Sequence, residues 1–152
     1  MSTTYSFKDS SGAFTHPVVG AFLFAGEVGF HQMVISMATE KTAQNVASDG
    51  AVMVSYIAGD NGTISFEVQQ TSALHAFLLA WYNTIKALAN EGNVQDWATA
   101  AITIRSIVDG SLHEATGVSP AKVPDKVYAA QGQNLTWLLH AADIQSITLG
   151  VL

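Results

Sequence analysis

Cysteine is absent from the 152 residues, which excludes disulfide bonds and thiolate metal sites. Charge is scarce, because Asp, Glu, Lys and Arg make up 12% of the chain, about half the usual share. Long apolar runs are missing too: the longest, Ala76–Tyr82, is far shorter than a membrane span. Yet 49% of the residues are hydrophobic. This combination predicts that the chain covers much of its surface with another molecule, most simply a second copy of itself.

Positive charge is especially sparse, since six Lys and Arg residues are scattered along the chain and the net charge is −6. Tight nucleic-acid binding needs several clustered phosphate contacts, so the sequence argues against it and predicts weak repulsion of DNA. The first residues lack the basic and apolar segments of a secretory signal, so we expect no export by that route. The length predicts one domain, residues 1–152.

Strand patterns dominate the sequence. Residues 63–70 alternate between apolar and polar side chains, and Asn61-Gly62 before them is typical of a tight turn. We therefore predict one hairpin from 51–58 and 63–70, and a second from 101–108 and 112–118 around Asp109-Gly110. The other predicted strands are 3–7 (a strand or an arm), 18–25, 30–37, 134–142 and 145–152.

One strong helix is predicted over 72–90, with Ser72 as its N-cap and Gly92 as its terminator. Its apolar residues recur at helical spacing, which predicts that this face packs on a sheet. Segment 39–50 is polar and rich in turn formers, and is either a solvated loop or a contact arm. Segment 119–125 contains two prolines and is expected to be irregular. The fold class predicted is α+β, mainly β: an antiparallel sheet curled into a barrel or sandwich, with one flanking helix.

Catalytic and metal-binding patterns are lacking, so we expect neither an enzyme nor a cofactor. No phosphate loop, nucleophile elbow or paired histidine motif occurs in the sequence. His75 has no second ligand at helical spacing and is interpreted as a partly buried or interface histidine. Arg105, on a predicted strand, could face a lumen or pair with an acidic residue of a neighbouring copy.

Several segments resemble a known family of phage structural proteins. They include YSFKDSSGAFTHPVVGAFLFAGE, ISMATEKTAQNVASDGAVMVSYIAGDNGTISFEVQQTSALHAFLLAWYN and VPDKVYAAQGQNLTWLLHAADI. Over Tyr5–Ile147 the chain is similar to the tail tube proteins of contractile-tailed phages, which share a fold with the tube protein of type VI secretion. The resemblance implies a structural virion protein that assembles in the host cytoplasm into stacked, hexameric rings. Such a tube carries DNA without binding it specifically, has no membrane role, and partners with sheath, baseplate and terminator proteins.

Under this resemblance, three groups of residues acquire expected roles. Contacts between subunits or rings are assigned to the N-terminal arm 1–7 and to segment 39–50, with candidates Tyr5, Phe7, Glu40, Lys41, Asn45 and Asp49. The lumen is assigned to the polar side chains Thr63, Ser65, Glu67 and Gln69. The sheath is expected to meet the exposed side of the helix at Asn83, Lys86 and Glu91.

Two other functions remain open at this stage. The same fold could serve a minor tail, baseplate or tail-completion protein, present in a few copies instead of hundreds. A small β-barrel that binds a ligand or glycan belongs to a different class and requires a concave pocket. No sequence feature indicates such a pocket.

Overall fold

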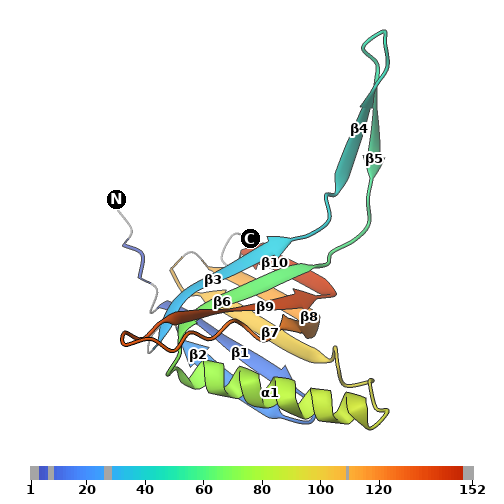
Figure 1. Ribbon diagram of the computed structural model, residues 1–152. Helices are drawn as coiled ribbons and strands as arrows, with labels where there is room; N and C mark the ends of the chain where they lie inside the picture. The colour runs from blue at the N-terminus through green and yellow to red at the C-terminus, as the bar shows by residue number, and fades with distance from the viewer. Residues whose placement is uncertain (1–3, 7–8, 26–28, 109, 149–152) are drawn as a thin grey trace.

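The computed structural model describes residues 4–6, 9–25, 29–108 and 110–148. Ten strands and one helix follow one another along this part of the chain (Figure 1). The elements are β1 (Ser10–His16), β2 (Gly20–Ala25), β3 (Phe30–Met37), β4 (Thr42–Val46), β5 (Val52–Tyr56), β6 (Gly62–Gln69), α1 (Ala73–Asn90), β7 (Ala100–Ser106), β8 (Ser111–Lys122), β9 (Asn134–Ala141) and β10 (Asp143–Thr148).

Eight of the strands form one curled antiparallel sheet in the order β2-β1-β7-β8-β9-β6-β3, with β10 also paired to β8. β8 joins the two halves, because its first part pairs with β7 and β10 and its last part with β9. The sheet folds over into a sandwich-like shape, and its end strands β2 and β3 are not paired with each other in the described chain. The predicted mainly β fold with one flanking helix is therefore confirmed, and the curl is not closed into a barrel.

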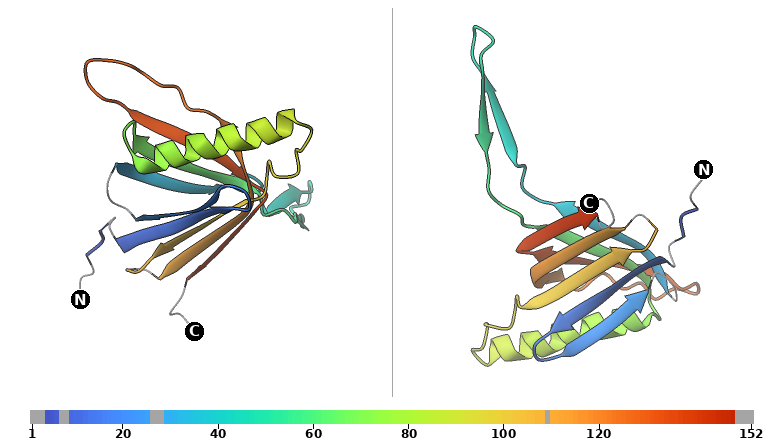
Figure 2. Two further views of the ribbon diagram at one scale, coloured as in Figure 1. Left: turned by 90° about the horizontal axis from the view of Figure 1, so that it is seen from below. Right: turned by 180° about the vertical axis from the view of Figure 1, so that it is seen from behind.

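The core lies inside the curled sheet, and α1 covers one open side of it (Figure 2). Strands β6 and β9 contribute side chains to this core in strict alternation, because every second residue of each strand is buried. Phe14 of β1 packs edge-on against Trp81 of α1, with ring centroids 4.8 Å apart. The helix therefore closes one side of the sheet with its apolar stripe. Helix α1 is not long and apolar enough to cross a membrane.

The helix confirms its predicted start and end. The Ser72 hydroxyl accepts a hydrogen bond from the His75 backbone N–H at 3.2 Å, which satisfies one free donor of the first turn. At the other end Gly92 has a φ of 91°, and the next backbone N–H, of Asn93, donates to the Leu88 carbonyl at 2.9 Å.

The predicted hairpin of 51–58 with 63–70 is wrong. β5 pairs with β4, whereas β6 pairs with β3 and β9. Asn61 does not form a tight turn between strands; its side-chain oxygen accepts a hydrogen bond from the Thr39 hydroxyl at 2.7 Å. Segment 39–50 is accordingly not a loop, because it contains strand β4. The two strands form a separate hairpin that projects from the body (Figure 1).

Two further predictions are corrected. Segment 119–125 is not irregular throughout, because β8 continues through Pro120 to Lys122. β7 pairs with β8 only as far as Val118, so Pro120 lies where one strand edge is open, a position that tolerates a missing N–H. At the N-terminus, residues 4–6 form no strand, and the first strand, β1, was not predicted.

The second predicted hairpin, formed by β7 and β8, is confirmed. The predicted last strand is β10 as far as Thr148, and residues 149–152 lie outside the described residues.

Candidate functional site

Three surfaces of the described structure carry predicted site residues. The first is the outer side of β6. Thr63, Ser65 and Glu67 are half-buried and Gln69 is exposed, while the residues between them are buried in the core. The four predicted lumen residues therefore share one face, here called the polar face. Side chains of β3 and β9 continue it in register: Gln32 and Thr136 flank Glu67, Val34 and Leu138 flank Ser65, and Ser36 and His140 flank Thr63.

The chemistry of the polar face is mostly that of uncharged hydroxyl and amide groups. Glu67 is the acidic group among its residues on β3, β6 and β9, and its Oε1 accepts a long hydrogen bond, 3.5 Å, from the Asn134 amide. Such a wall has few fixed charges to hold an anionic polymer and a slight negative bias. It suits passage of a solute better than its capture.

The second surface is the β4–β5 hairpin, residues 42–56. All ten residues of its two strands are exposed. Cross-strand partners lie on the same face of an antiparallel pair, so the register sorts the side chains into two faces. One face carries Val46 with Val52, Gln44 with Val54, and Thr42 with Tyr56. The other carries Asn45 with Met53, and Ala43 with Ser55. The hairpin is thus amphipathic, and its apolar face, Val46, Val52, Val54 and Tyr56, has no cover.

The base of the hairpin is held by polar contacts. Lys41 forms an ion pair with Asp60, and Gln145 of β10 donates to the other oxygen of that carboxylate at 3.3 Å. The hydrogen bond and charge of Lys41 keep the pKa of Asp60 below its ordinary value, against the opposing effect of burial. Ile57 N–H also donates to the Lys41 carbonyl at 2.8 Å. These contacts fix the direction in which the hairpin leaves the body.

The predicted contact residues lie at different places on this arm. Glu40 is exposed at the base, Asn45 lies on the less apolar face, and Asp49 is at the tip, where its carboxylate accepts the Ala51 N–H at 3.0 Å. Lys41 is half-buried and forms the ion pair with Asp60. The remaining candidates belong to the N-terminal arm: Tyr5 is 67% exposed, and Phe7 lies outside the described residues.

Strand β4 was not predicted, and β5, predicted as 51–58, was given the wrong partner. The available signal was Asp49-Gly50, a typical hairpin turn, between two short segments of β-forming residues. The prediction instead used Asn61-Gly62 as the turn, and it therefore paired β5 with the wrong strand. The apolar face of the hairpin was missed for the same reason, because only the pairing of β4 with β5 shows which side chains share a face.

The third surface is the exposed side of α1. Asn83, Lys86 and Glu91 are all exposed, as predicted for the outer side of the helix. Next to them a groove of about 590 Å³ separates the end of α1 from residues 94–98. The Lys86 ammonium lies 5.9 Å from the ring centre of Tyr82, and Tyr82 packs edge-on against Trp97.

The sequence of the whole chain decides the family. Residues 1–150 match the family described as bacteriophage PhiTE tail tube protein. The chain belongs to this tail tube protein family. It is therefore a tail tube-like structural protein of the phage tail, and so of the virion, and its family is one of structural proteins and not of enzymes. No curated protein matches the chain.

Solved structures share the fold at low sequence identity. A chain of the anti-feeding prophage baseplate matches with a TM-score of 0.62 and 15% identity, covering 99% of this chain and all of that one. A chain of the sheath–tube complex of an extracellular contractile injection system matches with a TM-score of 0.59 and 11% identity, covering 96% and 93%. A chain of the sheath/tube terminator of that kind of system gives 0.63 and 10%, covering 97% and 99%.

Proposed function

We propose that the protein assembles into stacked, hexameric rings that form the tail tube through which phage DNA is ejected. The observation that carries this proposal is the amphipathic β4–β5 hairpin. A lone two-stranded hairpin is marginally stable in water, and this one leaves four large apolar side chains exposed on one face. Packing against another copy would remove that surface from water. A repeated, head-to-tail contact of this kind extends into a stack instead of closing on itself.

Within a ring, pairing between sheet edges would join neighbouring copies. β3 ends the sheet on one side, and the last part of β8 has an unpaired edge on the side that β7 leaves open. Exposed edges of this kind recruit further strands, and a closed ring removes them. The N-terminal arm, including Tyr5 and Phe7, would add contacts between rings. Glu40 at the base of the hairpin, and Asn45 and Asp49 on the hairpin, would do the same.

The polar face would then line the lumen. Its hydroxyl and amide groups and the single acidic side chain of β6, Glu67, give DNA no cluster of positive charge to bind. The exposed side of α1, with Asn83, Lys86 and Glu91, would point outward to the sheath. Baseplate and terminator proteins would bind the two ends of the stack, and assembly would take place in the host cytoplasm.

A second candidate is a terminator or baseplate component of the same fold. The likeness to the baseplate and terminator chains, with TM-scores of 0.62 and 0.63, is as high as that to the sheath–tube complex, 0.59. Fold similarity therefore does not separate the roles, but copy number does. A tube protein repeats along the whole tail, whereas the other components occupy its ends.

The test is negative-stain electron microscopy of the purified protein over a range of concentrations, with counting of copies per phage particle. Hollow tubes or six-fold rings with a hole wide enough for duplex DNA, together with hundreds of copies per particle, are the expected results. A few copies per particle and no rings at any concentration would favour the terminator or baseplate role instead.

A further inference from the structure

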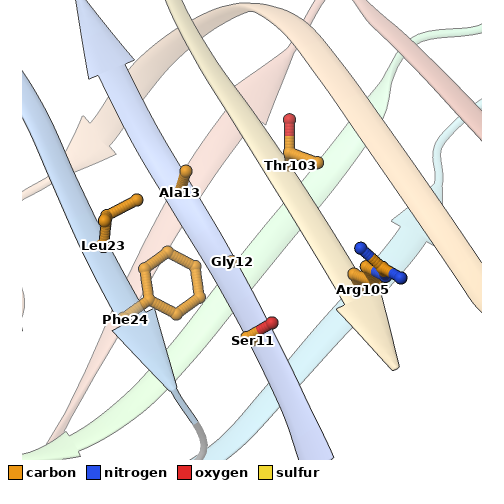
Figure 3. A pocket seen from close by; sticks show the side chains of 7 residues that line it. All are labelled: Ser11, Gly12, Ala13, Leu23, Phe24, Thr103 and Arg105. Carbon is orange, nitrogen blue, oxygen red and sulfur yellow. The ribbon is translucent and has the colours of Figure 1, made fainter. Parts of the chain in front are cut away.

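We propose that the apolar face of the β4–β5 hairpin docks on another copy in a groove between Leu23 and Arg105, here called the Leu23–Arg105 groove. This inference rests on the proposed tube function, because it names the surface that receives the hairpin. The groove lies on the outer side of three neighbouring strands and has a volume of about 520 Å³ (Figure 3). Its lining consists of Ser11, Gly12 and Ala13 of β1, Leu23 and Phe24 of β2, and Thr103 and Arg105 of β7.

The groove has the shape and polarity to receive aliphatic side chains. Leu23 is 79% exposed and lines one side of the groove, and the ring of Phe24 lies against Gly12 in the space that a side chain at residue 12 would take (Figure 3). Small residues, Ala13 and Thr103, keep the middle open. Its volume of about 520 Å³ is comparable to that of known ligand sites, and Leu23 and Phe24 supply apolar lining. The exposed valines and tyrosine of the hairpin are the matching apolar group.

Charge supports the hairpin as the occupant. Arg105 is exposed at the end of the groove and forms no ion pair with any residue that the structure describes. At the base of the hairpin Asp60 neutralises Lys41, so Glu40 at the base and Asp49 at the tip are acidic groups without an ion pair among the described residues. Asp49 at the tip is exposed and free to approach an arginine with its second carboxylate oxygen. An apolar face with an acidic tip thus meets an apolar groove with a cationic end.

The hairpin of the same copy is an unsuitable occupant. It arises between β3 and β6, at one end of the strand order, whereas the groove lies on β2, β1 and β7 at the other. Figures 1 and 2 show the hairpin directed away from these strands. The contact would therefore join different surfaces of two copies, and such a heterologous contact propagates along a stack.

Because the chain contains no cysteine, the contact can be tested with introduced cysteines. Two single variants, Leu23→Cys and Val54→Cys, are mixed under conditions in which tubes form and treated with a short bismaleimide. The expected product is a cross-linked dimer of the two variants, identified by mass spectrometry of the joined peptides. Val94→Cys, 63% exposed beside α1, is the matched control and should not cross-link to Val54→Cys.

Each other result overturns the inference. Cross-linking of Val54→Cys to itself would mean that two hairpins pack together, and cross-linking to Val94→Cys would place the hairpin beside α1. Tubes that form without the Leu23–Val54 product would refute the groove while leaving the tube function intact. Absence of both tubes and cross-links would refute both proposals.

A second variant tests the charge. Arg105→Glu, added to Leu23→Cys, should lower the cross-linking yield severalfold, whereas Lys126→Glu, at an exposed residue outside the groove, should not. Equal yields with both variants would refute the Arg105 contact.

Discussion

At the scale of single residues, His75 is a buried histidine whose protonation opposes folding. Its Nδ1 accepts a hydrogen bond from the Trp137 indole N–H at 3.0 Å, so the neutral ring carries its proton on Nε2. That Nε2 is buried without a partner among the described residues. Burial, and secondarily the positive charge of Lys126, lower the pKa of His75 from its ordinary value of 6.5. Protonation of Nδ1 would also break the bond to Trp137.

The free energy of unfolding should therefore fall as the pH drops through 6.5 toward the lower pKa of the folded state. The sign follows because the unfolded chain binds this proton more readily than the folded one. His75→Phe should flatten this pH dependence and lower stability at pH 7.5 by about 1–3 kcal/mol, since the buried Trp137 N–H loses its acceptor. Urea unfolding at several pH values measures both effects. An unchanged slope in His75→Phe would contradict the prediction.

Gly62 is a second single-residue constraint, set by close approach of other chain segments. A Cβ at this position would lie 2.7 Å from the Ile144 side chain and would collide with the Ser36 carbonyl oxygen. Gly62→Ala should lower the free energy of unfolding by about 1–3 kcal/mol, the usual effect of overpacking. Gly59→Ala is the matched control, because its nearest neighbour, the Asn61 side-chain oxygen, is 3.7 Å away. Equal unfolding midpoints for the two variants would contradict the prediction, because they would mean that the chain around residue 62 accommodates the added methyl group without loss of stability.

At the scale of elements, the β4–β5 hairpin should be dispensable for folding and required for tube growth. Removing 39–50 would cut one strand from the pair, so the better deletion removes 42–56 and joins Lys41 to Ile57 through Asn-Gly. The hydrogen bond between those two residues and the Lys41–Asp60 pair are then kept. We expect a protomer with near wild-type stability that forms no tubes. Thermal unfolding and electron microscopy measure the two properties, and tubes of normal length would contradict the assigned role.

A point-variant pair tests the same element without shortening it. Val54→Asp places a charge on the apolar face and should block tube growth, whereas Ser55→Asp on the opposite face should permit it. Electron microscopy of the two purified variants compares tube length directly. Equal growth of both would mean that the faces of the hairpin are equivalent in the assembly.

Local chemistry explains which elements could be predicted from the sequence. The helix was placed correctly because Ser72 and Gly92 act on their own neighbours, and β6 because its alternation is internal to the strand. The partners of β5 and β6 could not be predicted, since pairing depends on segments distant in sequence. Asn61-Gly62 has the sequence of a tight turn but serves other contacts. The Asn61 side chain accepts a hydrogen bond from Thr39, and Gly62 allows the Ser36 carbonyl to approach closely. The polar face was predicted with its residues, but its role still awaits a test.

At the scale of the whole molecule, the proposed tube would repeat each side chain once for every copy that it contains. One Glu67 per chain becomes a ring of carboxylates in every layer if the polar face lines the lumen. Glu67→Lys would convert each ring to positive charge, which attracts the DNA phosphates and retards their movement. We expect tubes of normal appearance and slower genome delivery, measured as DNA release from phage carrying the variant. Asp125→Lys makes the same charge change at an exposed residue outside the polar face and outside α1, and it should leave delivery unchanged. Equal delivery by both variants would mean that Glu67 does not face the DNA.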